Sequence, residues 1–387
     1  MNKFISSVEI ETIREDGTKH VYLQSGSAPK EGVGVEIADV SPTGERTVKV
    51  AKPMDSYVGN MVRILEGGFE NATFNVPDTS NTSRNFGGMT DGITRMLPAS
   101  ALVNDSTYGV VVGSGTNAVA ITDYKLQTQI VEGTGAGQLT HQVVQWNTYA
   151  TAGSTTSFVL KRRFTNGSGG DITINEIGIY VKTGHFPFFK FCIFRDVLGV
   201  SPYTVHNGET CEVQITVPIT LGSGYVGALA KLFFQTMTND TTTLLDTGNT
   251  SRTLALNYSQ FEMTDPANSA VNGVVVGTGN TAVTINDHAL QTQIAHGSGA
   301  GQLVHGAVQF DGIVTTGLTA YVDAKRTFTN SSGGSITINE IAVYARNRIT
   351  PSNTDDPFCI LRIVLNIPQT VLNGSPVQVK VNMGVSL

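Results

Sequence analysis

The amino-acid sequence predicts an all-β protein: two tandem homologous β-sandwich domains preceded by a short β-hairpin N-terminal segment. The strongest observation is an internal duplication, because residues 109–180 and 273–344 align without a gap and agree at roughly six positions in ten. The second observation is composition, since only 14% of the residues are charged and glycine occurs 42 times. Short β-branched runs lie between Gly, Asn and Ser turn signals, and no long stretch has the period of an amphipathic helix.

The duplication divides the chain into three parts. Matches continue outside the aligned blocks, since the tripeptide Tyr-Val-Gly at residues 57–59 recurs at 225–227. The repeated unit is therefore about 165 residues long, which is the size of a whole domain and too long for a solenoid or propeller repeat. We expect an N-terminal segment over residues 1–56, a first repeat over 57–224 and a second repeat over 225–387.

The N-terminal segment has the pattern of two β-hairpins. Residues 8–13 alternate apolar and polar side chains, Asp16-Gly17 is a turn signal, and residues 20–23 return as a second strand. Residues 34–37 and 47–50 repeat this pattern around a Ser-Pro-Thr-Gly turn. So short a segment is marginal alone, so we expect it to pack on its own first domain or to act as an arm onto a neighbouring subunit.

The sharpest signal in each repeat is Phe-Thr-Asn-x-Ser-Gly-Gly-x-Ile-Thr-Ile-Asn-Glu-Ile, which begins at Phe164 and again at Phe328. Its Asn-Gly-Ser-Gly-Gly stretch predicts a turn that joins residues 158–165 and 172–181 as an antiparallel hairpin. The apolar positions change parity after Ile174, so either both faces of the second strand are buried or a β-bulge at the Asn-Glu step reverses the register. The candidate structural residues are Gly169, Gly170, Asn175 and Glu176, with Gly333, Gly334, Asn339 and Glu340 in the second copy.

Glu176 and Glu340 are the obvious candidates for a catalytic carboxylate. No second acidic residue recurs beside them to complete an acid and base pair. A Glu at a bulge, near the Lys-Arg pair at residues 161–162, more often forms an ion pair or accepts backbone hydrogen bonds. The repeated Asp123 has the pattern of a cap on one short helical turn. We therefore expect both Glu side chains to be hydrogen-bonded, and the protein not to be an enzyme.

Other site chemistries receive no support from the sequence. The glycine-rich residues 133–139 lack the Lys and Ser or Thr of a P-loop, and no amphipathic helix follows them. The repeated His141 and His305 lie near no Gly-x-Ser-x-Gly element, and we interpret them as packed side chains. The three cysteines have the apolar context of buried free thiols and lack closely spaced ligand partners. We expect neither a cofactor nor a metal site.

Charge and hydropathy limit the partners. The formal net charge of -6 comes without a polybasic run, which argues against a dedicated nucleic-acid surface. The N-terminus has no apolar region of a signal peptide, and no stretch of about 18 apolar residues could span a bilayer. We expect a protein that stays soluble in the cytosol after synthesis and binds neither a membrane nor a specific nucleic-acid sequence.

The repeated motifs together resemble a module found in structural proteins of tailed bacteriophages and related environmental viral sequences. The motifs are Gly-Val-Val-Val-Gly-x-Gly, Asp-x-x-Leu-Gln-Thr-Gln-Ile, Gly-Ala-Gly-Gln-Leu and the Phe-Thr-Asn motif with its Tyr three residues after the last Ile. The resemblance covers residues 75–200 and 245–365. It implies a non-enzymatic virion structural protein that is assembled in the host cytoplasm and that contacts itself and other virion proteins in the tail, neck or a capsid-associated position.

The alternative function is a receptor- or carbohydrate-binding adhesion protein of the virion, which would contact a host surface through loops at one end of the sandwiches. Sugar-binding modules present clustered aromatic side chains, whereas Trp146 is the only Trp and is replaced by Phe310 in the second copy. The structural role is therefore favoured, with an enzyme that degrades envelope polymers in third place. Because each chain offers two equivalent sets of edges and loops, we expect a homo-oligomer, such as a ring in which a trimer imitates a hexamer.

Overall fold

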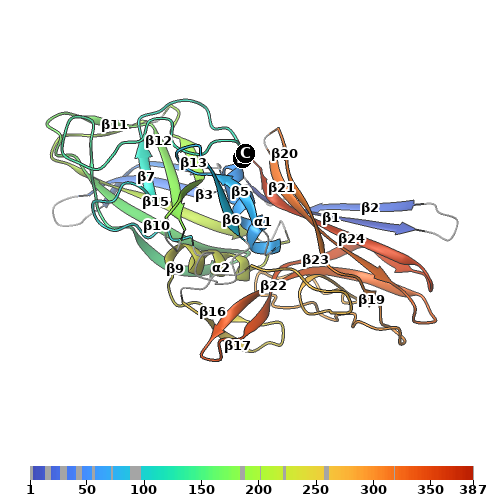
Figure 1. Ribbon diagram of the computed structural model, residues 1–387. Helices are drawn as coiled ribbons and strands as arrows, with labels where there is room; N and C mark the ends of the chain where they lie inside the picture. Colours follow the sequence, from blue (N-terminus) through green and yellow to red (C-terminus); the bar gives the residue numbers. More distant parts are fainter. Residues whose placement is uncertain are drawn as a thin grey trace.

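The computed structural model describes residues 3–13, 19–26, 33–40, 46–54, 57–70, 73–87, 97–183, 188–200, 202–220, 224–256, 261–317 and 319–386. Within these ranges the chain is mostly β, with two helices, α1 (Gly59–Glu70) and α2 (Gly227–Thr238). The predicted β-rich class is therefore confirmed. In Figure 1 most strands of the first repeat lie on the left of the view, most of those of the second repeat lie on the right, and the two helices lie near the middle, with β16 and β17 of the second repeat below α2.

The two repeats contain their strands in the same order. The strands of the first repeat are β5 (Thr73–Pro77), β6 (Ser83–Gly87), β7 (Gly109–Gly113), β8 (Thr140–His141), β9 (Gln145–Ala152), β10 (Thr155–Thr165), β11 (Ile172–Ile174), β12 (Glu176–Lys182), β13 (Lys190–Val197), β14 (Tyr203–Val205) and β15 (Thr210–Thr220). Those of the second repeat are β16 (Thr243–Leu245), β17 (Ser251–Leu254), β18 (Gly273–Gly277), β19 (Val304–His305), β20 (Gln309–Thr316), β21 (Thr319–Thr329), β22 (Ile336–Thr350), β23 (Asp355–Val371) and β24 (Pro376–Ser386).

The predicted N-terminal hairpins are confirmed in the described ranges. Strand β1 (Lys3–Ile13) pairs with β2 (Lys19–Gly26), and β3 (Val33–Val40) pairs with β4 (Arg46–Met54), both antiparallel. The predicted turns at residues 16–17 and 41–44 lie outside the described residues. The two hairpins do not both lie on the first repeat, because β3 pairs with β15 whereas β1 pairs with β24. Each hairpin therefore extends the sheet of a different repeat.

These two hairpins occupy equivalent positions in two equivalent sheets. The opposing residues are Val8 with Val381 and Ile10 with Val379 in one sheet, and Val35 with Ile215 and Ile37 with Val213 in the other. Strands β1 and β3 both carry Val-Glu-Ile at these positions. Each resulting sheet has six strands, in the order β4-β3-β15-β10-β8 with β9 also on β10, and β2-β1-β24-β21-β19 with β20 also on β21. Each hairpin thus pairs with a repeat of the same chain. That the N-terminal segment acts as an arm onto an adjacent subunit stays a prediction.

The hairpin predicted over residues 158–165 and 172–181 is wrong. Strand β10 pairs with β8, β9 and β15, whereas β11 pairs with β14, and β12 lies between β7 and β13. The physical reason is burial: β10 alternates buried and half-buried side chains, while the first six residues of β12 are all buried. A strand buried on both faces is typical of a sheet interior. The turn after β10 therefore connects two different sheets.

The two helices were missed by the sequence analysis, although each begins a repeat. Ten of the 12 residues in each helix are buried, so neither helix shows the polar face on which periodicity depends. The Gly59 amide donates to Ile121 O at 2.7 Å, and the Gly227 amide donates to Ile285 O at 2.8 Å. A Cβ at these glycines would lie 2.9 and 3.0 Å from the same oxygens. This close approach explains the glycine of the repeated Tyr-Val-Gly.

The two repeats interlock through reciprocal contacts. Helix α1 packs against β20, β21 and β24 of the second repeat, and α2 packs against the equivalent β9, β10 and β15 of the first. The Ala99 amide donates to Met237 O at 2.8 Å, and at the corresponding positions the Met263 amide donates to Phe69 O at 2.9 Å. Contacts of this kind mark an isologous interface around an approximate twofold axis. The predicted ring of equivalent modules therefore does not follow from the duplication alone, because a twofold interface closes on itself.

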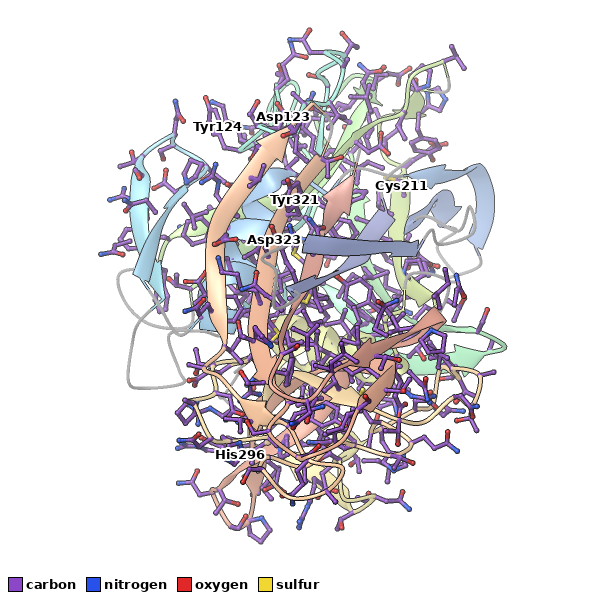
Figure 2. The ribbon with its side chains drawn as sticks, turned by 90° about the vertical axis from the view of Figure 1, so that its right-hand side faces the viewer. Asp123, Tyr124, Cys211, His296, Tyr321 and Asp323 are labelled. Atoms are coloured by element: carbon purple, nitrogen blue, oxygen red, sulfur yellow. The ribbon has the colours of Figure 1, made fainter. Side chains whose placement is uncertain are left out.

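Apolar positions that recur 164 residues apart are predicted to form the core of each repeat, and this prediction is confirmed. Every one of them is at most 7% exposed: Val111, Ile121, Leu126, Ile130, Leu139, Phe164, Ile174 and Ile177, with Val275, Ile285, Leu290, Ile294, Leu303, Phe328, Ile338 and Ile341. Between the helices an apolar cavity of about 30 Å³ is lined by residues of both repeats, including Leu65, Leu97 and Phe233. In Figure 2 Asp123 lies toward one end of the molecule, and His296, from the equivalent loop of the second repeat, lies toward the other end.

Candidate functional site

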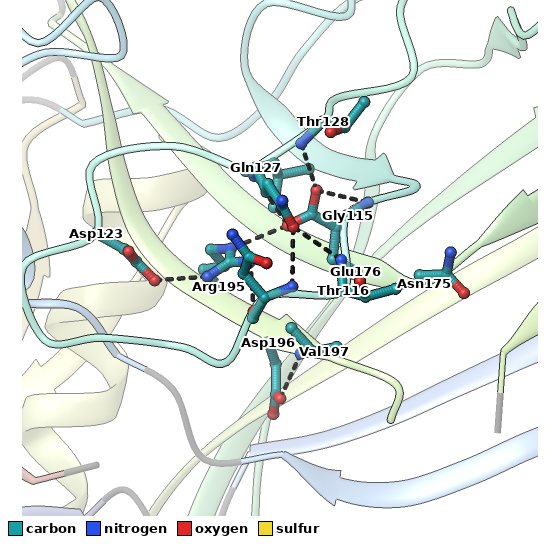
Figure 3. Close-up of polar contacts among 12 residues, drawn as sticks. Gly115, Thr116, Asp123, Gln127, Thr128, Asn175, Glu176, Arg195, Asp196 and Val197 are labelled. Carbon is teal, nitrogen blue, oxygen red and sulfur yellow. Dashed lines mark hydrogen bonds and ion pairs between the residues drawn. The ribbon is translucent and has the colours of Figure 1, made fainter. Parts of the chain in front are cut away.

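Each repeat contains a buried carboxylate that fastens a long loop. Glu176, at the start of β12, is fully buried, as is its counterpart Glu340 in β22. One oxygen of Glu176 accepts the backbone amides of Gly115 at 3.1 Å and Thr128 at 2.7 Å. Its other oxygen accepts the Gln127 amide at 3.0 Å and the Arg195 Nε at 2.9 Å (Figure 3). Both carboxylate oxygens are therefore occupied by donors, in agreement with the predicted hydrogen bonding.

The second copy has the same geometry. Glu340 accepts from the backbone amides of three residues and from one guanidinium at 2.8–3.0 Å: Gly279, Gln291, Thr292 and Arg362. The repeated Tyr holds the same loop, since Leu126 N donates to the Tyr180 hydroxyl and Leu290 N donates to the Tyr344 hydroxyl. The segment between β7 and β8, which has almost no regular structure, is thus held from within the fold.

Arg195 links the carboxylate to the part of this loop that lies between the two stretches bound by Glu176. It comes from β13, is 3% exposed, and donates to Asp123 Oδ2 at 2.6 Å and to Asn117 O at 2.9 Å. Burial opposes the charged guanidinium, but its hydrogen bonds to Asp123 and Glu176 outweigh burial and raise the pKa of Arg195. Figure 3 shows Arg195 between Asp123 and Glu176. Arg362 occupies the same place, 2.6 Å from Asp287.

The structure corrects the predicted cationic partner of Glu176 and the predicted role of Asp123. The cationic partner of Glu176 is Arg195, whereas Lys161 and Arg162 lie on β10 in another sheet. The missed signal was Phe-Cys-Ile-x-Arg, which ends at Arg195 and again at Arg362. Asp123 accepts the Ala120 amide at 2.9 Å in a turn and not in a helix, so it closes a turn and pairs with Arg195.

The repeated glycines beside the carboxylate leave room for it. A Cβ at Gly113 would lie 2.6 Å from Glu176 Oε1, and one at Gly115 would lie 2.4 Å from the same oxygen. Gly277 and Gly279 have the same distances to Glu340 Oε1. The Val run before Gly113 predicts a hairpin turn at residues 113–115, and the equivalent run predicts one at 277–279. This prediction is wrong, because these glycines serve close contact with a carboxylate.

The Asn-Glu step interrupts the strand, as the parity change predicted. In the first repeat β11 ends before Asn175 and β12 begins after it, and in the second repeat the register shifts between Ile338 and Glu340. The Asn175 side chain donates to Ser114 O at 2.9 Å, and the Asn339 side chain donates to Thr278 O at 2.6 Å. Both Asn residues therefore also bind the start of the loop.

The glycine pair before this step divides into two roles. Gly169 has a φ of +84° and Gly333 a φ of +85°, a region that side chains disfavour. Their amides donate to an Asn side chain of the facing turn at 2.8 Å in both copies. Gly170 and Gly334 have no such φ, and a Cβ on either would meet nothing within 4 Å. Backbone geometry therefore requires only the first glycine of each pair.

A second buried cation was missed. Arg162 is 1% exposed, and its Nε donates to Gln142 O at 2.6 Å while its other nitrogens donate to further backbone carbonyls. His141 packs edge-on against Phe164 with ring centroids 5.0 Å apart. Burial, followed by the charge of Arg162, lowers the pKa of His141 to about 4. Arg326 and His305 repeat this arrangement, so both predicted packed histidines are confirmed.

The contact between the repeats is chemically different on its two sides. On one side Phe234 of α2 packs against Tyr149 and Phe158, with ring centroids 5.5 and 5.6 Å apart. On the other side the corresponding residue is Glu66, which accepts the Ile313 amide at 3.0 Å. Burial, with Glu66 and Asp311 as neighbouring charges, raises the pKa of Glu70 to about 7. One side of the interlock is aromatic and the other is acidic.

The described side chains mainly make structural contacts, and few are arranged for catalysis or metal binding. Cys192, Cys211 and Cys359 are buried and form no disulfide, as predicted. Within the described ranges no group of three or more His, Cys, Asp or Glu residues is arranged to hold a metal ion. Neither α1 nor α2, the helices of the described ranges, is long and apolar enough to cross a membrane. A general acid or base must reach its substrate, and the two repeated Glu side chains have no exposed surface.

The chain was compared with protein-family models, with curated proteins and with solved structures. None of the three comparisons found a match.

Proposed function

We propose that this chain is a non-enzymatic structural protein of a tailed-bacteriophage virion, and that it self-associates as a building block of the tail, the neck or a capsid-associated layer. The proposal begins from the resemblance of the repeated motifs to virion structural modules. Its partners are further copies of itself and other virion proteins.

One observation carries the structural role. In both repeats the shared polar residues point inward and hold loops, and none of the oxygens of Glu176 and Glu340 is free for a substrate. Buried polar groups with all partners satisfied stabilise one conformation of a fold. The reciprocal packing of α1 and α2 adds contacts between the two repeats. These features support a structural role, in which the protein acts through its shape and not through catalysis.

The same proposal includes a finer description of the fold. We infer that each repeat is a β-sandwich of two facing sheets. One is the six-stranded sheet, and the other is the smaller sheet that contains β7 and β12 in the first repeat and β18 and β22 in the second. Contacts of β7 with β10, and of β18 with β21 and β24, support it. The two units are residues 57–224 and 225–387, and each is completed by one N-terminal hairpin.

A second candidate function, that of a receptor- or carbohydrate-binding adhesion protein of the virion, is favoured by one asymmetry. Leu102, Val103 and Val143 are 67%, 52% and 41% exposed in the first repeat. They gather where the chain runs are adjacent, since the Asn104 amide donates to His141 O and the Val144 amide donates to Ala101 O. The second repeat has Pro or Ala at the three corresponding positions. Exposed apolar patches of this kind often mark interaction sites.

Electron microscopy of the purified full-length chain, with hydrolysis assays on cell-envelope polymers, tests the two roles. We expect regular particles of one symmetry and no release of sugar or peptide. Hydrolysis that Glu176→Gln abolishes would contradict the structural role. Binding to host cells that Leu102→Ser and Val143→Ser abolish together, without a change in particle shape, would select the adhesion role instead.

A further inference from the structure

Both six-stranded sheets end in a strand of an N-terminal hairpin. Strand β2 ends one sheet and β4 ends the other, and in the described ranges neither has a partner on its outer side. Figure 1 shows β2 on the outer side of β1. An edge strand presents a row of unpaired N–H and C=O groups, which form a template for pairing with another strand.

The two edges differ in how the sequence protects them. Strand β4 carries Arg46, Lys49, Lys52 and Pro53 within nine residues. Lysine and proline on an edge strand are the usual means of preventing edge-to-edge association. Strand β2 has one formally charged residue, Lys19, at its first position, and then continues through His20 to Val-Tyr-Leu-Gln-Ser-Gly. The hairpins are equivalent in position but not in protection.

We propose that β2 is the edge through which two copies of this chain associate. Strand β2 of one copy pairs antiparallel with β2 of a second copy, so that one sheet continues across both chains. A second copy is the occupant because identical strands paired antiparallel around a twofold axis form a closed, isologous dimer. The stretch Val21–Gln24 carries no charge that would meet itself across this axis. This inference rests on the self-association in the proposed function and names the surface that carries it.

The test places lysine on the unprotected edge. The double variant Val21→Lys and Leu23→Lys sets like charges against one another across the axis. Its matched control is Val48→Lys and Ala51→Lys on β4, because Val21 and Val48 lie opposite equivalent residues of the first strand of each hairpin, as do Leu23 and Ala51. The mass of each full-length protein is measured by light scattering over a concentration series. We expect the β2 variant to raise the dimer dissociation constant at least about tenfold, or about 1.4 kcal/mol, and the control to leave it unchanged.

Amide hydrogen exchange provides a second measurement on the unmodified chain. Residues 19–26 are expected to exchange more slowly at the concentrations where the mass doubles, whereas residues 46–54 keep one rate throughout. This readout keeps the test decisive if the double variant does not fold.

The outcomes separate the two proposals. If the protein associates but neither the β2 variant nor the exchange of residues 19–26 responds, the β2 edge is overturned and self-association stands. If the chain remains a monomer at every concentration, both are overturned.

Discussion

Replacing Glu176 by Gln tests whether the buried carboxylate holds the loop that follows β7. Gln has the same shape, so the substitution changes charge and hydrogen bonding while creating no cavity. Each carboxylate oxygen meets two N–H donors, so the new amide nitrogen faces two donors in either orientation. Arg195 also loses one of its two carboxylate partners and keeps Asp123 at 2.6 Å.

The expected cost follows from these contacts. Removing one partner of a buried ion pair destabilises proteins by about 3–5 kcal/mol. Because Asp123 still neutralises Arg195, we expect a loss of about 3 kcal/mol in the free energy of unfolding, at the lower end of that range. For a unit of the size of one repeat, this corresponds to a fall in Tm of about 6–12 °C.

Urea unfolding measures this loss directly. Trp146, the only Trp, reports on the junction of the repeats because its indole N–H donates to Asp240 at 3.1 Å. The exposed Glu209→Gln is the control and should stay within about 0.5 kcal/mol of the unmodified protein. Glu340→Gln should reproduce the loss in the second repeat. A Glu176→Gln protein as stable as the control would refute the assignment of this carboxylate as a structural centre.

Three further predictions concern single side chains. Glu70 has a folded pKa of about 7 against 4.5 for the free group, so the folded state binds more protons and stability falls as pH rises from 4.5 to 7; the Glu70→Gln variant should lose this slope in thermal melts. His141 has a folded pKa of about 4 against 6.5, so its contribution is complete above pH 6.5 and is lost as pH falls toward 4. In a protein with both His141→Gln and His305→Gln, stability should fall less steeply as the pH decreases from 6.5 to 4. An unchanged fall in stability would contradict the assignment of both imidazoles as buried and neutral. Gly169→Ala should cost about 1–2 kcal/mol because its φ is positive, whereas Gly170→Ala should be neutral or slightly stabilising, and equal effects in urea unfolding would refute the distinction.

Local patterns were sufficient to predict much of the fold. The duplication and the alternating runs identified the β class, the hairpin strands around residues 8–13 and 20–23 and around 34–37 and 47–50, and core residues such as Phe164 and Ile174. The parity change after Ile174 also located the interruption at Asn175, because alternation of side chains is a local property of a strand.

The pairing of the strands and the cationic partner of Glu176 could not be predicted from local patterns. Arg195 meets Glu176 only because β13 lies beside β12, and this pairing depends on contacts distant in sequence. The turn at residues 166–170 looked like a hairpin turn, but burial of β12 on both faces sends the chain to another sheet. The helices escaped detection because burial on nearly all sides removes the periodic polar face.

We propose that this chain is a self-associating building block, and the mass of the native full-length protein tests that claim most directly. One chain has a mass of 41.1 kDa. We predict a mass that rises with concentration to an integer multiple of this value and then stays constant. A mass of one chain at every concentration would contradict the account.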